Sequence, residues 1–238
     1  MTNPKILVTG GNGGIASELL PILTEKGYEV IVLDKFESFI PQKNVHLIHC
    51  DLSKEEEIIN VIKEGSETWL PKLEGIVHLA GIYPNKPFNE YSSELWDYVF
   101  AVNVRSLFIL IHNLLNKNAK SLKSIVITSS TASKIGSRDP AYASSKAALN
   151  GLAKNLSIIL SNSNIRVNTI LPGIINTVMS QNQSIARRNE HAENTLAKYI
   201  GKPEEVAKVI AFLLSNDASY IWGASIDVNG GMTIWEDY

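Results

Sequence analysis

The sequence is poor in three features that mark whole classes of protein. It has a single cysteine, Cys50, among 238 residues, so no disulfide can form within the chain, which fits a reducing compartment. Positive charge is not in excess, because the formal net charge is -2, and neither nucleic acid nor an anionic membrane is expected as a partner. The 5 histidines show no ligand spacing, so no metal site is predicted.

The sequence also lacks clear membrane and secretion signals. No apolar run is expected to be long enough to span a bilayer, and Met1 leads straight into a strand pattern rather than a secretory signal. We therefore expect a cytoplasmic protein with no membrane partner. Hydrophobic residues make up 45% of the sequence, without an internal repeat or linker, which predicts a single domain over residues 1–238.

Short β-rich runs alternate with longer helical patterns along the whole chain. The predicted strands are 5–9, 29–33, 45–49, 75–79, 124–128, 165–170 and 225–228. Near-continuous apolar strands separated by helices are typical of a parallel sheet that is covered on both faces. With right-handed crossovers, the sequence predicts an α/β fold: a doubly wound, Rossmann-like three-layer sandwich of about seven parallel strands.

Two predicted helices are apolar almost all round, namely residues 92–116 and the helix that contains Tyr142 and Leu149. Burial inside the monomer and a helical subunit interface both explain such a pattern. Residues 178–200 are polar and follow a predicted strand. That segment is either a lid over a site or a solvated pair of helices.

A glycine-rich turn joins the first predicted strand to the first predicted helix, residues 15–26. Glycines let the backbone approach a pyrophosphate closely, and the helix N-terminus adds unpaired N–H groups and a positive dipole end. The spacing is Gly10-x-x-x-Gly14-x-Ala16 rather than G-x-G-x-x-G. The turn residues expected to contact a dinucleotide are Gly10, Asn12, Gly13, Gly14 and Ile15.

Carboxylates end the second and third predicted strands. Asp34 is placed to accept hydrogen bonds from ribose hydroxyls and would repel a 2′-phosphate, so NAD is favoured over NADP. The neighbouring Lys35 softens that preference. Asp51, with Leu52 beside it, either meets the adenine amino group or caps the next helix.

Tyr142 and Lys146 are one helical turn apart, so the phenol and the ammonium lie on one face. A nearby positive charge favours phenolate and lowers the pKa of a tyrosine, which makes the pair a candidate acid–base device. Ser129 ends the fifth strand, where its hydroxyl can polarise a substrate carbonyl, and Ser130 is an adjacent alternative. Asn103 lies in the apolar helix and either holds a water in a proton relay or satisfies a core backbone group.

Together these residues resemble the short-chain dehydrogenase/reductase family, in its compact single-domain branch, and the resemblance covers essentially the whole chain. The matching elements are Thr9-Gly10, Gly14, Asp34, Asp51, Ala80-Gly81, Asn103, Ile127-Thr-Ser129, Tyr142-x-x-x-Lys146, Pro172-Gly173, Thr177 and Asn229-Gly-Gly231. The further cofactor-binding positions that the resemblance implies are Ala80, Gly81, Pro172, Gly173, Ile175 and Thr177.

The resemblance also implies a division of labour. Tyr142 would be the general acid in carbonyl reduction and the base in alcohol oxidation. Lys146 would lower the pKa of that tyrosine and bind the nicotinamide ribose. Ser129 would orient the substrate oxygen, and Asn103 would anchor a water that joins Lys146 to solvent. NAD is the implied cofactor, a small alcohol or carbonyl compound the substrate, and a homotetramer or homodimer the assembly.

Three departures from the family pattern stand out. Ala16 replaces a third glycine, a small-for-small change that should still allow the helix to pack on its strand. Leu79, after His78, stands where the branch usually has asparagine, which predicts the loss of a polar group that ties the central strands together. Gly10-x-x-Gly13 and His78-Leu-Ala80 also resemble the extended branch, but 238 residues leave no room for its substrate domain.

Two alternative functions remain open from the sequence. One is a lyase, epimerase or dehydratase that retains tightly bound NAD. The other is a non-catalytic NAD-binding regulator, against which the complete set of Ser129, Tyr142, Lys146 and Asn103 argues. The substrate is not specified, and the residues expected to line its pocket are Tyr83, Pro84, Phe88, Tyr91 and the segment from Val178 onward.

Overall fold

The computed structural model describes residues 3–36, 42–117, 119–181 and 184–234. Within these ranges the strands form one 7-stranded sheet in the order β3-β2-β1-β4-β5-β6-β7, and every neighbouring pair is parallel. The strands are β1 (Lys5–Thr9), β2 (Glu29–Asp34), β3 (Val45–His49), β4 (Leu73–His78), β5 (Ser124–Thr128), β6 (Arg166–Pro172) and β7 (Ser225–Val228). All seven predicted strands are confirmed, and the order reverses between β1 and β4.

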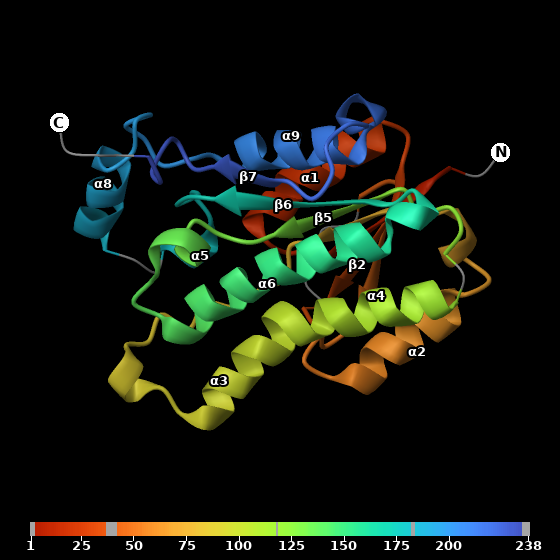
Figure 1. The fold of residues 1–238 in the computed structure, drawn as a ribbon, viewed down its shortest axis with the longest axis horizontal. Helices are drawn as coiled ribbons and strands as arrows, with labels where there is room; N and C mark the ends of the chain where they lie inside the picture. The colour runs from red at the N-terminus through yellow and green to blue at the C-terminus, as the bar shows by residue number, and fades with distance from the viewer. Residues whose placement is uncertain (1–2, 37–41, 118, 182–183, 235–238) are drawn as a thin grey trace.

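Helices cover both faces of the sheet, which confirms the predicted three-layer sandwich (Figure 1). On one face α1 (Gly14–Glu25) packs beside α9 (Pro203–Leu214). On the other face lie α2 (Glu55–Gly65), α4 (Ser106–Asn116) and α6 (Pro140–Ile159). Each face has its own apolar cluster, because the continuous Val, Ile and Leu runs of the central strands send side chains to both sides. Ala16 is fully buried between α1 and the sheet, as the small-residue pattern predicts.

The predicted helix over residues 92–116 is real but is not a uniform α-helix. It consists of α3 (Ser93–Phe100), a π-helical turn η3 (Ala101–Arg105) and α4. The extra residue of a π turn rotates the side chains that follow it, and such turns occur often at functional sites. Here the turn contains Asn103.

The expectation that no apolar run can span a bilayer is wrong as a statement about length. Residues Ser93–Asn116 form a 24-residue helix of mean hydropathy 1.5, which is long and apolar enough by length and composition. In this fold 56% of its most apolar window is buried inside the protein. Its apolar faces pack against α2 and α6, which is the behaviour of a core helix.

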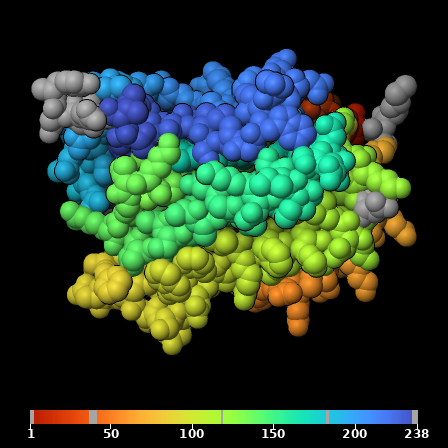
Figure 2. All heavy atoms as spheres, viewed as in Figure 1, coloured from red at the N-terminus to blue at the C-terminus, as the bar shows by residue number. Residues whose placement is uncertain are grey.

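The same helix and α6 lie side by side on one face of the molecule (Figures 1 and 2). Their inner sides hold buried residues such as Leu110 and Leu149, and their outer sides expose Phe108, Ile158 and Ile159. Both explanations offered by the sequence therefore keep support: part of each helix builds the core, and part is left on the surface. A subunit interface on this surface stays a prediction.

Short elements gather where the strands β5, β6 and β7 end (Figure 1). They include α5 (Ala132–Ile135), α7 (Val178–Gln181) and α8 (Ile185–Glu193). The polar segment 178–200 is thus helical over 178–181 and 185–193, and its motion as a lid stays a prediction. The 3₁₀ turns, which connect the larger elements, are Leu70–Lys72, Phe88–Glu90, Ser161–Ser163 and Asn216–Ala218.

Candidate active site

The glycine turn after β1 has the close backbone packing that its sequence suggests. Gly10 has a φ of 73°, and a Cβ at this position would lie 2.7 Å from the backbone nitrogen of Ala80. A Cβ on Gly14 would lie 2.8 Å from Cγ2 of Thr177. The N-terminus of α1 begins after Gly13, which provides no side-chain cap, so its first N–H groups are free to meet an anion.

A cavity of about 240 Å³ lies beside this turn. The predicted cofactor-binding residues that line it are Gly10, Asn12, Gly13, Asp34, Asp51, Leu52, Ala80 and Gly81. Asp34 is buried and its carboxylate accepts hydrogen bonds from the backbone N–H groups of Asn12, at 3.0 Å, and Phe36, at 3.1 Å. Lys35 also lines the cavity, but its ammonium donates to the Tyr98 hydroxyl at 3.2 Å.

Asp51 lines the same cavity without capping α2. Its Oδ1 accepts hydrogen bonds from the N–H of Ser53, at 3.0 Å, and from the Ser53 hydroxyl, at 2.7 Å. Burial raises the pKa of Asp51, but the hydrogen bonds from Ser53 and the charge of Lys54 outweigh it and lower the pKa overall. The residue preceding α2 is Lys54, so the capping alternative for Asp51 is wrong.

Tyr142 and Lys146 both lie on α6 and line a second cavity, of about 220 Å³. The Lys146 ammonium lies 5.7 Å from the centre of the Tyr142 ring and donates to the carbonyl oxygen of Thr128 at 2.9 Å. The Tyr142 ring packs edge-on against Tyr83, with ring centres 4.9 Å apart. The predicted acid–base pair is therefore assembled inside a cavity at the end of β5.

The pKa values of this pair move differently from what the sequence suggests. Burial raises the pKa of Tyr142, and a hydrogen bond with Ser130 opposes the rise only in part. Burial also lowers the pKa of Lys146 to about 8. The expected lowering of the Tyr142 pKa by Lys146 does not appear in this structure, because desolvation of the phenol dominates and the ammonium is engaged by Thr128.

Ser129 and Ser130 point to different surroundings. Ser129 is 2% exposed, and its hydroxyl donates to the carbonyl oxygen of Lys146 at 2.8 Å. The Ser130 oxygen accepts from the N–H of Ala132 at 3.1 Å and is hydrogen-bonded to the Tyr142 side chain. The Ser129 hydroxyl is therefore hydrogen-bonded to the main chain of α6, and this geometry does not match the prediction that it polarises the substrate. Ser130 is the serine beside the phenol.

Asn103 lies beneath the second cavity and does not line it. Its side chain makes three hydrogen bonds: it accepts from the Ile82 N–H at 2.8 Å, and donates to the Ile82 carbonyl at 3.2 Å and to the Ser145 hydroxyl at 3.0 Å. These contacts clamp the segment after β4 to α6. The core-satisfying explanation is confirmed, and a water-mediated relay stays a proposal.

His78 corrects one of the predicted departures. It is fully buried, with Nδ1 2.9 Å from the Thr9 hydroxyl and Nε2 3.3 Å from the backbone carbonyl of Asn103. A carbonyl only accepts, so Nε2 carries the proton and Nδ1 accepts from Thr9. Burial lowers the pKa of His78 to about 3, which keeps it neutral. His78 therefore supplies a polar link between β4 and β1, one residue before the position at which the family usually has asparagine.

The segment after β6 closes the second cavity. Residues of the predicted cofactor and catalytic sets that line this cavity are Ile15, Gly81, Ser129, Tyr142, Lys146, Pro172, Gly173, Ile175 and Thr177. A Cβ on Gly173 would lie 3.0 Å from Cα of Asn229, so the segment packs tightly on the turn after β7.

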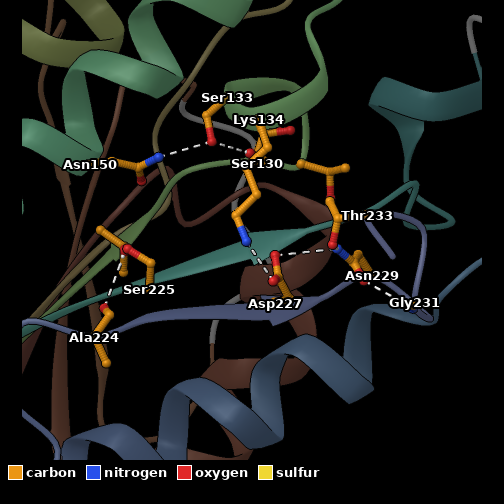
Figure 3. Close-up of polar contacts among 12 residues, drawn as sticks. Ser130, Ser133, Lys134, Asn150, Ala224, Ser225, Asp227, Asn229, Gly231 and Thr233 are labelled. Atoms are coloured by element: carbon orange, nitrogen blue, oxygen red, sulfur yellow. Dashed lines mark hydrogen bonds and ion pairs between the residues drawn. The ribbon is translucent and has the colours of Figure 1, made fainter. Parts of the chain in front are cut away.

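That turn is held by side chains near the ends of β5 and β7 (Figure 3). The Asn229 amide donates to Asp227 at 3.3 Å and to Thr233 at 3.2 Å, and its oxygen accepts from the Gly231 N–H at 3.0 Å. The Lys134 ammonium reaches from α5 to Asp227 at 2.6 Å. The Asn229-Gly-Gly231 motif thus stabilises the wall behind Gly173.

Four residues near the cavity were not singled out from the sequence for a functional role: His78, Asp139, Arg187 and His191. Asp139 is fully buried and caps α6: its Oδ1 accepts from the Tyr142 N–H at 2.8 Å and from the Tyr91 hydroxyl at 2.6 Å. An aspartate directly before a proline is a helix-start signal that could have indicated this role. Of the aromatic residues expected in the pocket, Tyr83 lines it, and Phe88 is 81% exposed.

The two cavities share the lining residues Leu79, Gly81 and Met179, so they form one trough along the carboxyl ends of the central strands. A carboxylate at one end, uncapped helix N–H groups in the middle and a buried tyrosine–lysine pair at the other suit an extended dinucleotide. A Cβ on Gly81 would lie 3.1 Å from the Lys146 ammonium, which shows how closely the trough is shaped. Within the described ranges no three metal-ligating side chains gather.

Known proteins match the chain over nearly its full length. The family model described as Enoyl-(Acyl carrier protein) reductase matches residues 11–233. The chain is 32% identical over 241 residues to the 3-oxoacyl-[acyl-carrier-protein] reductase FabG of Rickettsia conorii, with 98% of each protein covered. It is 31% identical over 244 residues to the cyclopentanol dehydrogenase of Comamonas testosteroni, with 96% of each covered. A solved 4-hydroxyisoleucine dehydrogenase complexed with NADH has a TM-score of 0.92 at 27% identity, covering 98% of this chain and 100% of that one.

The matched range contains the glycine turn from Gly11 onward, the tyrosine–lysine pair and the segment after β6. Fold, sequence and site therefore agree. The chain belongs to the short-chain dehydrogenase/reductase family of oxidoreductases, which bind a nicotinamide cofactor and act on alcohol or carbonyl groups.

Proposed function

We propose that this protein is an NAD-dependent oxidoreductase that transfers a hydride between the nicotinamide and a small-molecule alcohol or ketone. The observation that carries the proposal is the partly buried Tyr142, which lies beside both Ser130 and Lys146 in a cavity continuous with the glycine turn. When bound, the nicotinamide supplies or accepts the hydride. The chain's own task is to position the substrate carbonyl and move one proton.

In the reducing direction the Tyr142 hydroxyl gives its proton to the developing alkoxide. With a pKa above its ordinary value, the phenol carries the proton that the reduction requires. The Ser130 hydroxyl, held by the Ala132 N–H, donates to the same substrate oxygen. Lys146 lies behind the phenol with its ammonium near the cofactor end of the cavity, where it would bind the ribose hydroxyls.

Asn103 holds the backbone that surrounds Lys146, through Ile82 and Ser145. We include it as the residue that would anchor a water connecting Lys146 to solvent. Gly10, Asn12, Gly13, Gly14 and Ile15 would hold the pyrophosphate, as proposed above for the uncapped end of α1.

Preference for NAD over NADP is supported by Asp34. Its carboxylate lies at the adenosine end of the trough, where a 2′-phosphate would meet a negative charge. Lys35, the nearest cation in sequence, donates to Tyr98, and no arginine is among the described residues that line this cavity. The neighbour complexed with NADH is consistent with this preference, whereas the name of the FabG relatives does not specify a cofactor.

The proposal is tested by assaying a panel of alcohols and ketones with NAD(H) and with NADP(H), in wild type, Tyr142→Phe and Asp34→Asn. We expect Tyr142→Phe to lower kcat by about 100- to 10,000-fold while NADH still binds. Asp34→Asn keeps the shape of the side chain, so the ratio of kcat/KM for NADPH over NADH should rise by about tenfold or more. Undiminished turnover by Tyr142→Phe would contradict the mechanism, and a wild-type preference for NADPH would contradict the cofactor assignment.

A further inference from the structure

The helix α8 places two nitrogen-rich side chains in the wall of the catalytic cavity. Arg187 and His191 are one helical turn apart, and both line the cavity that holds Tyr142 and Ser130. The hydroxyl of Ser184 begins the helix by accepting from the Arg187 N–H at 3.3 Å. The hydride-transfer chemistry proposed above gives neither side chain a task.

Arg187 is half-buried and is held by His191 rather than by an acid. Its Nε donates to Nε2 of His191 at 3.4 Å, which makes that ring nitrogen an acceptor and leaves the imidazole neutral. Burial lowers the pKa of His191, the charges of Arg187 and Arg138 lower it further, and only Glu190 opposes them. Across the described part of the chain, no ion pair joins Arg187 to a carboxylate.

The charge balance of the cavity is one-sided. Two of its described lining residues, Lys146 and Arg187, carry a fixed positive charge, and the lining includes neither aspartate nor glutamate. Lys146 is already engaged by the Thr128 carbonyl next to Tyr142. The guanidinium is therefore a partly buried cation without a counter-charge among the described lining residues of its cavity, and a bound carboxylate would supply one.

We propose that the substrate is a hydroxy or oxo acid whose carboxylate is bound by Arg187, with His191 holding the guanidinium in place. This inference rests on the proposed function and adds the class of substrate to it. A guanidinium binds a carboxylate through two parallel hydrogen bonds, so it orients the substrate as well as attracting it. Ile135, Met179 and Met232 also line the cavity and offer apolar surface to a short carbon chain.

The test compares oxo acids with their uncharged analogues. NADH oxidation is measured with 3-oxobutanoate, 4-oxopentanoate and 5-oxohexanoate and with their methyl esters, in wild type, Arg187→Lys and Arg187→Met. We expect the wild type to favour at least one acid over its ester by about 10- to 100-fold in kcat/KM, and Arg187→Met to remove that preference. Arg187→Lys should retain part of it, since it keeps the charge but not the paired geometry. Lys208→Ala, which removes a cation from the exposed surface of α9, is the matched control and should change nothing.

A binding measurement separates this inference from the hydride-transfer proposal. Quenching of NADH fluorescence in the enzyme–NADH complex is titrated with 4-oxopentanoate and with its methyl ester. Tighter binding of the acid that is lost in Arg187→Met supports the carboxylate site even if no compound in the panel is reduced, an outcome that would count against hydride transfer instead. Equal turnover and binding of acids and esters, unchanged in Arg187→Met, would overturn the inference and leave the hydride-transfer proposal standing.

Discussion

Burial determines the chemistry of individual residues in this site. It raises the pKa of Tyr142, so the phenol keeps its proton, and it lowers the pKa of Lys146 to about 8, so the ammonium is still the main form at pH 7. The spacing of the pair on one helical face is readable from the sequence. The directions of the pKa shifts are not, because they depend on how deeply α6 is covered by elements far away in the chain.

The two adjacent serines provide the sharpest prediction at the residue scale. Ser130→Ala removes the hydroxyl beside Tyr142 and should lower kcat by about 100- to 1,000-fold, the cost of losing one donor to a developing oxyanion. Ser129→Ala removes a buried hydrogen bond to the Lys146 carbonyl, so it should reduce stability by about 1 kcal/mol with a smaller effect on kcat. Steady-state kinetics and urea denaturation of both variants measure this contrast, and a larger kcat loss in Ser129→Ala would reverse the assignment.

Because His78 is buried and neutral, the stability of the wild type should fall in acid, and the variant His78→Gln should lose part of this pH dependence. The unfolded chain protonates this imidazole near pH 6.5, whereas the folded protein keeps it neutral down to about pH 3. The unfolded state then binds more protons, so stability falls as the pH drops below about 6.5, by up to about 1.4 kcal/mol per pH unit. His78→Gln retains a donor and an acceptor but does not titrate. Denaturant unfolding between pH 7 and 5 should give a shallower slope for the variant, and equal slopes would show that His78 does not stay neutral.

At the scale of elements, the sequence predicts most of the fold because the signals are local. Each strand is a short apolar run, and the glycine turn and Asp34 occur at the points where strands end. The π turn around Asn103 and the link from His78 to Thr9 could not be predicted in the same way. Both depend on contacts among segments far apart in the chain, since His78 contacts Thr9 and the backbone of Asn103. The residues next to each of them in the sequence do not indicate these contacts. Asp139 is different, since an aspartate directly before Pro140 is a local signal for the start of α6.

Two glycine substitutions should differ in their effects, because a Cβ at Gly14 would meet a neighbour and a Cβ at Gly151 would not. Gly14→Ala places a methyl group 2.8 Å from Cγ2 of Thr177, so one of the two must move, and the affinity for NADH should fall by about tenfold or more. Gly151 lies in α6 with nothing within 4 Å of its would-be Cβ. Gly151→Ala should therefore stabilise the protein by about 0.5–1 kcal/mol and leave NADH affinity unchanged. Fluorescence titration and thermal unfolding measure both, and unaltered NADH affinity in Gly14→Ala would argue against cofactor binding at this turn.

At the scale of the whole molecule, the sheet order places the two cavities end to end across the switch between β1 and β4. The sequence does not specify this continuity, because the lining residues come from strand ends far apart in the chain. The segment 178–200 contributes Met179, Arg187 and His191 to the wall, which agrees with its proposed role over the substrate. Its composition alone could not distinguish such a wall from a solvated helix pair.

The outer surface of the long apolar helix and α6 predicts self-association. Phe108 on α4 is 55% exposed and Ile158 on α6 is 73% exposed. The two helices are neighbours in Figure 1, so these side chains are candidates for contact with a second copy. Sedimentation equilibrium at micromolar concentration should therefore give a mass of two or four times 26.2 kDa. The double variant Phe108→Asp, Ile158→Asp should shift the mass downward because it buries charge in the contact. A monomeric wild type at that concentration would contradict the predicted dimer or tetramer.

The central claim is that the trough carries out direct hydride transfer with Tyr142 as the proton donor. The most direct measurement uses NADH that carries deuterium in both positions at C4, with mass spectrometry of the alcohol formed from a panel of ketones and oxo acids. The wild type is predicted to place one deuterium on the carbinol carbon, and Tyr142→Phe to form that product at least about 100-fold more slowly. An alcohol without deuterium, labelled product formed equally fast by Tyr142→Phe, or no product from any compound would contradict the claim.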